Sequence, residues 1–196
     1  PENSSWDQQL TDHLYGGDEH YRLCQEFILG VGGVEMLREL GHGDIATYHM
    51  NEGHSALLVV PLIEKQIESS GRRFPSEEDL AEVRRKCVFT THTPIPAGHD
   101  RFPGDLVRQV LGEERTTRLF SSGFTGHDHL NMTHVALHHS NYVNGVAMRH
   151  GQVSRAMFPN YRIKALTNGV HAGTWTSPAF RELFDREIPE WRHDNI

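Results

Sequence analysis

The chain of 196 residues carries 15 histidines, so side chains that can exchange protons or bind metal ions near neutral pH are plentiful. His134 and His138 are four residues apart, which places both on one face of a helix, where they could share a metal ion. The zinc signature His-Glu-x-x-His is absent, because residue 135 is Val, and no cysteine lies nearby. We therefore expect a polar surface helix and a loop, not a metal site, in the cluster formed by His127, His129, His134, His138 and His139.

A second candidate for chemistry is Ser55, which follows a predicted strand and a sharp turn at Asn51-Glu52-Gly53. This order resembles the elbow that carries the nucleophilic serine of some hydrolases. That motif, G-x-S-x-G, needs a small residue at its fifth position to allow the tight crossing, and the residue here is Leu57. We interpret Ser55 as a helix N-cap, and a serine hydrolase remains an alternative.

Three further segments place polar residues directly after a predicted strand. One is Thr91-His92-Thr93, which opens a proline-stiffened loop over 92–103, and the others are the Asn-Gly pairs at 144–145 and 168–169. Stiff loops at strand ends can hold polar groups in place before a ligand binds. Asn-Gly tolerates a positive φ, and the segments after each pair do not alternate as hairpin strands would. We expect both pairs to expose backbone N–H groups and an amide side chain to one crevice, which suits the hydroxyls of a sugar. The alternative for His92 is a hydrogen-bonded core residue.

The elements that must position these residues alternate between helix and strand. Helices are predicted from an N-cap at Asp18 to a stop at Gly41, and at 55–70, from 76, and at 106–111, 131–140, 149–158 and 177–184. Strands are predicted at 45–50, 87–91, 142–147 and 162–166, and an irregular stretch at 112–130. Gly30, Gly32 and Gly33 interrupt the first helix and suggest a close backbone approach by another element. The alternation predicts an α/β fold with a parallel sheet covered by helices. In such sheets ligands bind beyond the carboxyl ends of the strands, where the polar segments fall.

Composition and charge narrow the function classes. A net charge of −7 argues against a nucleic-acid binder. The sequence contains no run of about 18 apolar residues, so we expect no membrane span. We also expect no secretory signal. Two cysteines cannot form a disulfide framework, so we expect a cytoplasmic protein. The chain opens on Pro1 and not on Met, which suggests a piece of something larger.

Taken together, the motifs resemble those of the α-glucan phosphorylases, which include glycogen, starch and maltodextrin phosphorylases. The resemblance covers roughly residues 12–195 and is greatest to the shorter bacterial and archaeal branch. The motifs stand in the family's order: Tyr15-Gly-Gly-Asp, Tyr21-Arg-Leu-Cys-Gln-Glu, His49-Met-Asn-Glu-Gly-His-Ser-Ala, Thr91-His-Thr-Pro-Ile-Pro-Ala-Gly-His, Val143-Asn-Gly-Val-Ala and Thr167-Asn-Gly-Val-His.

This resemblance implies a Rossmann-like parallel sheet with helices on both faces, within the N-terminal lobe of a two-lobed glycosyltransferase of the GT-B type. The family transfers glucosyl units between the non-reducing end of an α-1,4-glucan and phosphate, forming glucose 1-phosphate with retention. The resemblance implies that His92, Val146 and Asn168 bind the glucosyl unit and that Glu52 and His54 lie on the acceptor side. The transition state is oxocarbenium-like, so a main-chain carbonyl at His92 would serve the developing charge better than a cationic side chain.

The acceptor-side motif reads Asn-Glu-Gly-His-Ser, where the muscle and plant enzymes have Asn-Asp-Thr-His-Pro. The family's cofactor is pyridoxal phosphate, but none of the three lysines, Lys65, Lys86 and Lys164, lies in a motif matching the Schiff-base lysine. We therefore expect residues 1–17 to be a polar lead-in and 18–196 to be a partial N-terminal lobe, inactive alone and without cofactor, metal or an assigned catalytic residue.

Expected partners of the full-length enzyme are an α-1,4-glucan or maltooligosaccharide, with phosphate or glucose 1-phosphate, and no nucleic acid or membrane. A homo-oligomeric full-length enzyme is compatible with the resemblance. Two alternatives remain open: a nucleotide-sugar-dependent glycosyltransferase similar to glycogen or starch synthase, and a non-catalytic carbohydrate-binding remnant.

Overall fold

The computed structural model describes residues 2–14, 16–123 and 128–193. It divides into two compact units, Pro1–Leu166 and Thr167–Ile196, which are described separately. Neither unit ends at residue 17, and the division into a lead-in and a partial lobe stays a prediction. Within the described ranges, no helix has the length and apolar character needed to cross a membrane.

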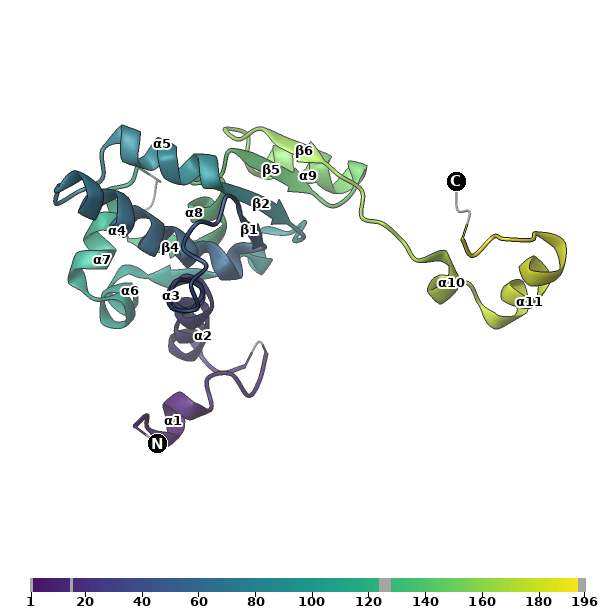
Figure 1. Cartoon of the computed structure of the whole chain (residues 1–196), viewed down its shortest axis with the longest axis horizontal. Coiled ribbons are helices and arrows are strands. Elements are labelled where there is room, and N and C mark those ends of the chain that lie inside the picture. Colours follow the sequence, from purple (N-terminus) through teal and green to yellow (C-terminus); the bar gives the residue numbers. More distant parts are fainter. Residues whose placement is uncertain (1, 15, 124–127, 194–196) are drawn as a thin grey trace. The chain divides into compact units, whose positions relative to one another are not determined.

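The first unit is built on a parallel sheet with helices packed against it (Figure 1). Its strands follow the order β1-β2-β5-β6 and neighbours pair in parallel. A second, two-stranded sheet pairs β3 and β4 antiparallel. The strands are β1 (Tyr48–Asn51), β2 (Cys87–Thr91), β3 (Arg101–Pro103), β4 (His129–Asn131), β5 (Tyr142–Gly145) and β6 (Ile163–Ala165). The predicted α/β class and parallel sheet are confirmed.

The helices of this unit follow the sequence signals closely. Asp18 caps the first long helix by accepting from the Tyr21 N–H, and Ser76 forms a capping box with Asp79. Gly71, at φ 67°, ends the fourth helix as predicted. The helices are α1 (Ser5–Gln8), α2 (Glu19–Phe27), the π-helix η1 (Ile28–Gly32), α3 (Gly33–Glu39), the 3₁₀-helix η2 (Gly53–Leu58), α4 (Val59–Ser70), α5 (Glu77–Lys86), η3 (Pro96–Gly98), α6 (Gly104–Leu111), α7 (Glu113–Phe120), α8 (Met132–His138) and α9 (Met148–Met157).

Several predicted elements differ in the structure. The helix predicted at 55–70 begins as the 3₁₀-helix η2 and is α-helical only from Val59, and the predicted loop at 92–103 contains η3 and β3. The stretch 112–130 is not irregular throughout, because α7 forms there and buries Thr116 and Leu119 on one face. The helix predicted from Asp18 to Gly41 is not continuous, because the π-helix η1 separates α2 from α3. The close backbone approach expected at the glycines is confirmed at Gly30, where a Cβ would lie 2.7 Å from the Leu58 backbone nitrogen.

The hydrophobic core joins the sheet to its helices. Phe89 of β2 and Met50 of β1 are fully buried, and so are Leu57 of η2 and Ile63 of α4, at 2% exposed or less. Burial on this scale holds the four strand ends in a fixed relation. The packed core therefore fixes the positions of the polar residues that follow the strands.

The second unit contains α10 (Ala172–Trp175) and α11 (Pro178–Glu187). Helix α11 begins after Ser177, as predicted, whereas α10 was not predicted. Neither helix has a buried residue, and Trp175 is 79% exposed.

Candidate functional site at the carboxyl edge of the sheet

Three of the predicted site residues directly follow strands of the parallel sheet, at the edge that we call the carboxyl edge. Glu52 follows β1, His92 follows β2 and Val146 follows β5. The register pairs Thr91 with Gly145, so His92 and Val146 are the next positions on neighbouring strands. Asn168 lies in the second unit, and its place in the site stays a prediction.

Glu52 is bonded to the end of the neighbouring strand. Its carboxylate accepts hydrogen bonds from the His92 N–H at 2.5 Å, from the Thr93 hydroxyl at 3.1 Å and from the Thr91 hydroxyl at 3.3 Å. Glu52 is 9% exposed and has φ 65° and ψ 175°, a region that residues other than glycine rarely adopt. The carboxylate is thus engaged in holding the His92 backbone, while the His92 residue itself is exposed.

Beside this edge lies an ion-pair cluster of four residues, Arg22 and Glu26 from α2, His54 from η2 and Asp100 from the loop after η3. Arg22 Nη2 lies 2.9 Å from Asp100 Oδ2, and Arg22 Nε lies 3.2 Å from Glu26 Oε1. His54 Nδ1 lies 3.2 Å from Asp100 Oδ2 and 3.7 Å from Glu26 Oε1. The Glu26 side chain is only 3% exposed.

Sequence reasoning singled out His54 but missed the other three members of this ion-pair cluster. The i, i+4 spacing of Arg22 and Glu26 on one helix was the signal that could have revealed their pairing. Asp100 lies 78 residues from Arg22, and no spacing rule connects them. The close crossing at Gly30 brings η1 against η2, and thereby sets α2 beside His54.

Burial and neighbouring charges shift the pKa values of three residues in this cluster. Burial raises the pKa of Glu26 to about 7. Hydrogen bonds to Asp100 and then Glu26 raise the pKa of His54 to about 9. Burial alone would raise the pKa of Asp100, but its interactions with His54, Glu26 and Arg22 outweigh burial and hold this pKa well below its usual range.

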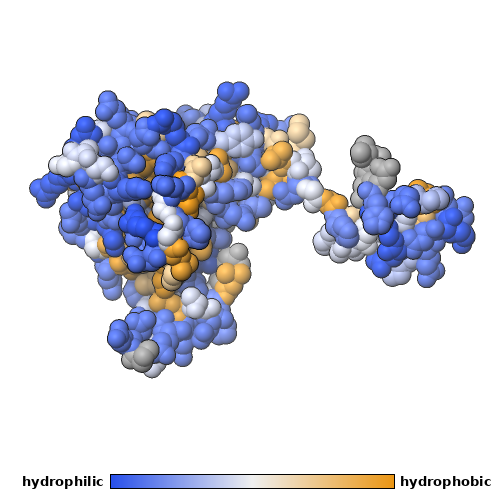
Figure 2. Space-filling view, viewed as in Figure 1, coloured by the Kyte–Doolittle hydropathy of each residue, from blue (hydrophilic) through white to orange (hydrophobic). Residues whose placement is uncertain are grey.

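The ion-pair cluster borders two hollows. One, of about 290 Å³, is lined by Arg22, Glu26 and His54 together with apolar residues that include Leu14 and Leu29. Figure 2 shows apolar surface where the N-terminal segment joins the rest of the unit. The other, of about 640 Å³, is lined by Arg22, by residues 16–19 and by residues 99–102. Pockets of about 300–1,000 Å³ are typical for small ligands, so a sugar fits either in size.

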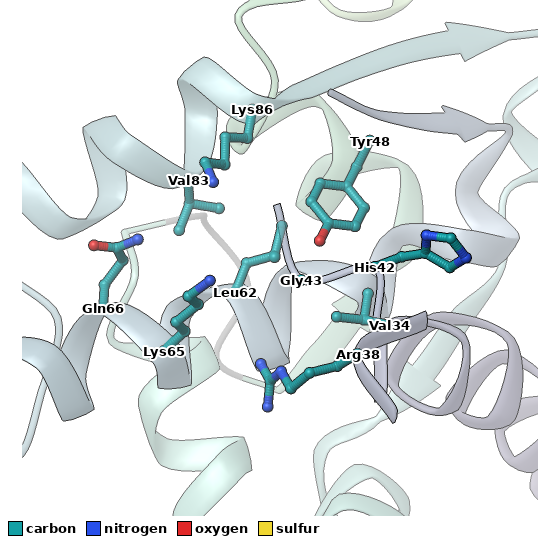
Figure 3. A pocket seen from close by; sticks show the side chains of 10 residues that line it. All are labelled: Val34, Arg38, His42, Gly43, Tyr48, Leu62, Lys65, Gln66, Val83 and Lys86. Carbon is teal, nitrogen blue, oxygen red and sulfur yellow. The ribbon is translucent and has the colours of Figure 1, made fainter. Parts of the chain in front are cut away.

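A third hollow lies at the opposite end of β1, beside Tyr48 (Figure 3). Arg38, Lys65 and Lys86 also line it, which makes it basic. Its volume of about 20 Å³ has room for little more than a water molecule. It is therefore too small for a glucosyl unit, and it lies away from the carboxyl edge.

Three predictions about polar groups are wrong. Helix α8 is not a polar surface helix, because five of its seven residues are buried and His139, which follows it, is fully buried. Ser55 is not an N-cap, because it lies inside η2, and its hydroxyl is buried without a hydrogen bond in the described part of the chain. Asn144 does not present its amide to a crevice. It is 7% exposed, and its Oδ1 accepts from the Thr90 hydroxyl at 3.1 Å, so it links strands β2 and β5 inside the sheet.

The histidines that could have shared a metal ion have separate partners. The His134 ring packs against Phe158 at 5.5 Å, and His138 Nε2 lies 3.1 Å from the Arg84 guanidinium. His127 lies outside the described residues. Within the described ranges, the ligand atoms of Glu26, His54 and Asp100 do lie within 4.8 Å of one another. The Arg22 guanidinium already supplies the positive charge there, so we interpret the cluster as an ion-pair network and not as a metal site.

None of the three lysines fits the role of an aldehyde-binding lysine at the carboxyl edge. Lys65 and Lys86 line the small hollow at the opposite end of β1. Lys164 lies in β6 and places its ammonium 4.9 Å from the centre of the Tyr142 ring. The structure thus places none of these three lysines beside Glu52, His92 or Val146.

The fold and the site together define an α/β unit with polar groups at its strand ends and two ligand-sized hollows beside the ion-pair cluster. Phosphorylases are among its relatives. The glycogen phosphorylase of Mycobacterium tuberculosis is 36% identical over 93% of this chain and 24% of its own length. The maltodextrin phosphorylase of Thermococcus litoralis is 37% identical over 98% of the chain and 24% of its length. For the glycogen phosphorylase of Aquifex aeolicus the identity is 29%, over 96% of the chain and 29% of that protein. No family model matches the chain.

These relatives confirm the resemblance to the α-glucan phosphorylases, and this chain is homologous to part of such proteins. It spans about a quarter of the length of the curated relatives it matches.

Proposed function

We propose that this chain is a segment of an α-glucan phosphorylase, an enzyme that transfers glucosyl units between the non-reducing end of an α-1,4-glucan and phosphate, with glucose 1-phosphate as the other partner. Similarity to glycogen and maltodextrin phosphorylases over nearly the whole chain supports this proposal. In this proposal the first unit is part of the N-terminal lobe of a two-lobed glycosyltransferase. The rest of the longer protein supplies the pyridoxal phosphate.

The observation that carries the proposal is the arrangement of Glu52, His92 and Val146 at the carboxyl edge. A glucosyl unit there would meet His92 and Val146 side by side, because the register makes them neighbours. The Glu52 carboxylate holds the His92 N–H and so fixes the peptide that would face the sugar. Orientation of this kind lowers the barrier without any covalent chemistry by these residues. Asn168, which lies in the second unit, is proposed as a further sugar-binding residue on the resemblance to the family alone.

On the acceptor side, the proposal places His54 and, more remotely, Glu52. His54 lines the hollow of about 290 Å³, whereas Glu52 is buried with its carboxylate bonded to the β2 end. In this proposal Glu52 does not contact the acceptor. It influences acceptor binding by holding the His92 backbone in place. We further propose a cytoplasmic location and a homo-oligomeric full-length enzyme.

The test is an assay of the complete protein whose sequence includes this chain. We expect phosphate release from glucose 1-phosphate with a maltooligosaccharide primer, and the reverse phosphorolysis of that primer. Transfer from a nucleotide sugar, with no use of glucose 1-phosphate, would establish a synthase-like enzyme instead. Binding of maltooligosaccharide without turnover of either donor would establish a carbohydrate-binding protein. We expect the 196-residue chain alone to be inactive with both donors and to show no cofactor absorbance.

A further inference from the structure

We propose that the hollow beside Tyr48, which we call the basic hollow, is a binding site for a small tetrahedral oxyanion of the class of inorganic phosphate. The side chains of Arg38, Lys65 and Lys86 would hold the anion together with the Tyr48 hydroxyl. Such a site does not depend on the proposed function, because it lies at the end of β1 opposite the carboxyl edge.

Three helices and one strand bring these side chains to the basic hollow. Arg38 comes from α3, Lys65 from α4 and Lys86 from α5, and Tyr48 begins β1. Figure 3 shows the polar ends of Lys65, Lys86 and Tyr48 turned toward the space between them. Since these residues are far apart in the sequence, only the packing of the helices on the strand gathers their charges in one place.

The basic hollow combines a packed base with accessible charges. Three buried apolar residues form part of its lining, namely Val34, Leu62 and Val83. Close-packed side chains of this kind move little, so the helices that carry the cations are held in a fixed relation. Arg38 and Lys65 are exposed and Lys86 is half-buried, so an anion from solvent can reach all three.

The positive charge of the basic hollow has little compensation from acids. No carboxylate is among the described residues that line it. Within the ranges that the structure describes, neither Lys65 nor Lys86 takes part in an ion pair. Glu64 and Glu82, on the same two helices, pair with arginines instead, and Glu68, three residues after Lys65, is exposed and does not line the hollow. Two ammonium groups thus share this hollow, and a bound anion would offset their repulsion.

Arg38 and Tyr48 add hydrogen-bond donors to the two ammonium groups. Arg38 Nη1 lies 3.1 Å from Glu35 Oε2, but both side chains are exposed, so solvent weakens this pair and the other N–H groups of the guanidinium stay available. Burial raises the pKa of Tyr48 although the Arg38 charge acts in the opposite direction. The Tyr48 hydroxyl therefore keeps its proton near pH 7 and can donate it to an anion.

The size of the basic hollow limits the class of ligand. Its volume of about 20 Å³ takes a group the size of a water molecule. One oxygen of a phosphate ion has this size, and the remaining oxygens would lie at the mouth, within reach of the long lysine side chains. Ammonium and guanidinium groups bind phosphate oxygens through charge-assisted hydrogen bonds, which are stronger than neutral ones. A sugar ring cannot enter, so the basic hollow is not a second glucan site.

The first test is isothermal titration calorimetry of the 196-residue chain with inorganic phosphate at constant ionic strength and pH 7.5. We expect saturable binding of one phosphate per chain. In Lys65→Gln and in Lys86→Gln we expect the Kd to rise at least about tenfold, because each variant loses a charge-assisted hydrogen bond. Lys65→Arg keeps the charge, and its Kd should stay within about threefold of the wild-type value.

Arg85→Gln and Lys164→Gln are the matched controls, because each removes one positive charge from a residue that does not line the basic hollow. Arg85 pairs with Glu82 on α5, and Lys164 lies over the Tyr142 ring. We expect an unchanged Kd in both. An equal rise in the controls would attribute the effect to net charge and overturn the proposal. So would an absence of saturable binding at millimolar phosphate, or binding that persists in both lysine variants.

The second test compares urea unfolding of the chain in phosphate and in sodium chloride of equal ionic strength. Phosphate should raise the unfolding midpoint, because a ligand that binds only the folded state stabilises it, and Lys65→Gln should abolish this gain. The same gain in chloride would contradict the site. Circular dichroism identifies a variant that fails to fold, and the exposed position of Lys65 makes Lys65→Gln the deciding variant in that case. None of these measurements uses enzyme activity, so failure of the proposed function would leave their outcome unchanged.

Discussion

The backbone of Glu52 offers a sharp test of how the carboxyl edge is held. Its φ of 65° and ψ of 175° lie in a region that is open to glycine and costs other residues about 1–3 kcal/mol. At an ordinary φ, glycine is less stable than alanine by about 0.5–1 kcal/mol, because it loses more conformational freedom on folding. Subtracting this cost from the strain gives a range of about 0–2.5 kcal/mol, so we expect Glu52→Gly to be more stable than Glu52→Ala by about 1 kcal/mol.

Both variants lose the same three hydrogen bonds to residues 91–93, so the bonds cancel in this comparison. The assay is urea or thermal unfolding of the 196-residue chain, where 1 kcal/mol corresponds to about 2–4 °C in Tm. Glu68 provides the matched control, because it is an exposed residue inside α4. There we expect the reverse order, with Glu68→Gly about 1 kcal/mol less stable than Glu68→Ala.

If glycine were the less stable residue at position 52 by the same margin as at position 68, the reasoning about strain would be wrong. A third variant, Glu52→Gln, keeps the strained backbone and removes the charge. We expect it to be less stable than the wild type by about 1–1.5 kcal/mol, because the His92 N–H then bonds to a neutral acceptor at best.

Three further predictions concern other parts of the chain. In the complete protein, Asn168→Ala should reduce kcat/KM for glucose 1-phosphate by about 2 kcal/mol, and an unchanged value would remove Asn168 from the site. Folding raises the pKa of Glu26 from 4.5 to about 7, so its contribution to the free energy of unfolding is fully present below pH 4.5 and falls by up to about 3 kcal/mol as the pH rises through 7. In urea unfolding, Glu26→Gln should make the free energy of unfolding decline less steeply over this pH range. If the wild type and Glu26→Gln declined equally steeply, the burial argument would be contradicted. Ser76→Ala should cost about 1 kcal/mol through loss of its capping box, whereas Ser177→Ala, at an N-cap without a side-chain hydrogen bond, should cost far less; equal costs would show that the Ser76 bond contributes nothing.

Local signals in the sequence predicted much of the fold because they act within one element. The run Cys87–Thr91 predicted β2 residue for residue, since β-branched and aromatic side chains bounded by a helix end and a proline-rich loop leave little choice. Asp18, Ser76 and Gly71 marked helix ends through capping chemistry that involves near neighbours only. Helix α7 was missed because its sequence, Glu-Glu-Arg-Thr-Thr-Arg-Leu-Phe, shows few apolar residues.

The site was less predictable, because its contacts join distant parts of the chain. The strand ends were correctly placed together, since parallel strands bring their carboxyl ends to one edge. The ion-pair cluster was not foreseen, because Arg22 and Asp100 meet only through the tertiary fold. Asn144 shows a different difficulty. An Asn-Gly pair permits a turn but does not say whether the amide faces outward, and here it bonds to Thr90 within the sheet.

Gly30 carries a consequence for how this chain can vary. The crossing of η1 and η2 leaves no room for a Cβ at this position, with the Leu57 carbonyl carbon 2.8 Å and the Leu58 nitrogen 2.7 Å from where it would lie. The backbone contact sets the spacing between the helix that carries Glu26 and the one that carries His54. A single methyl group at residue 30 would push the two helices apart. It would thereby change the pKa of His54, a side chain that it does not contact. The pKa values in the ion-pair cluster thus depend on residue 30, which has no functional group.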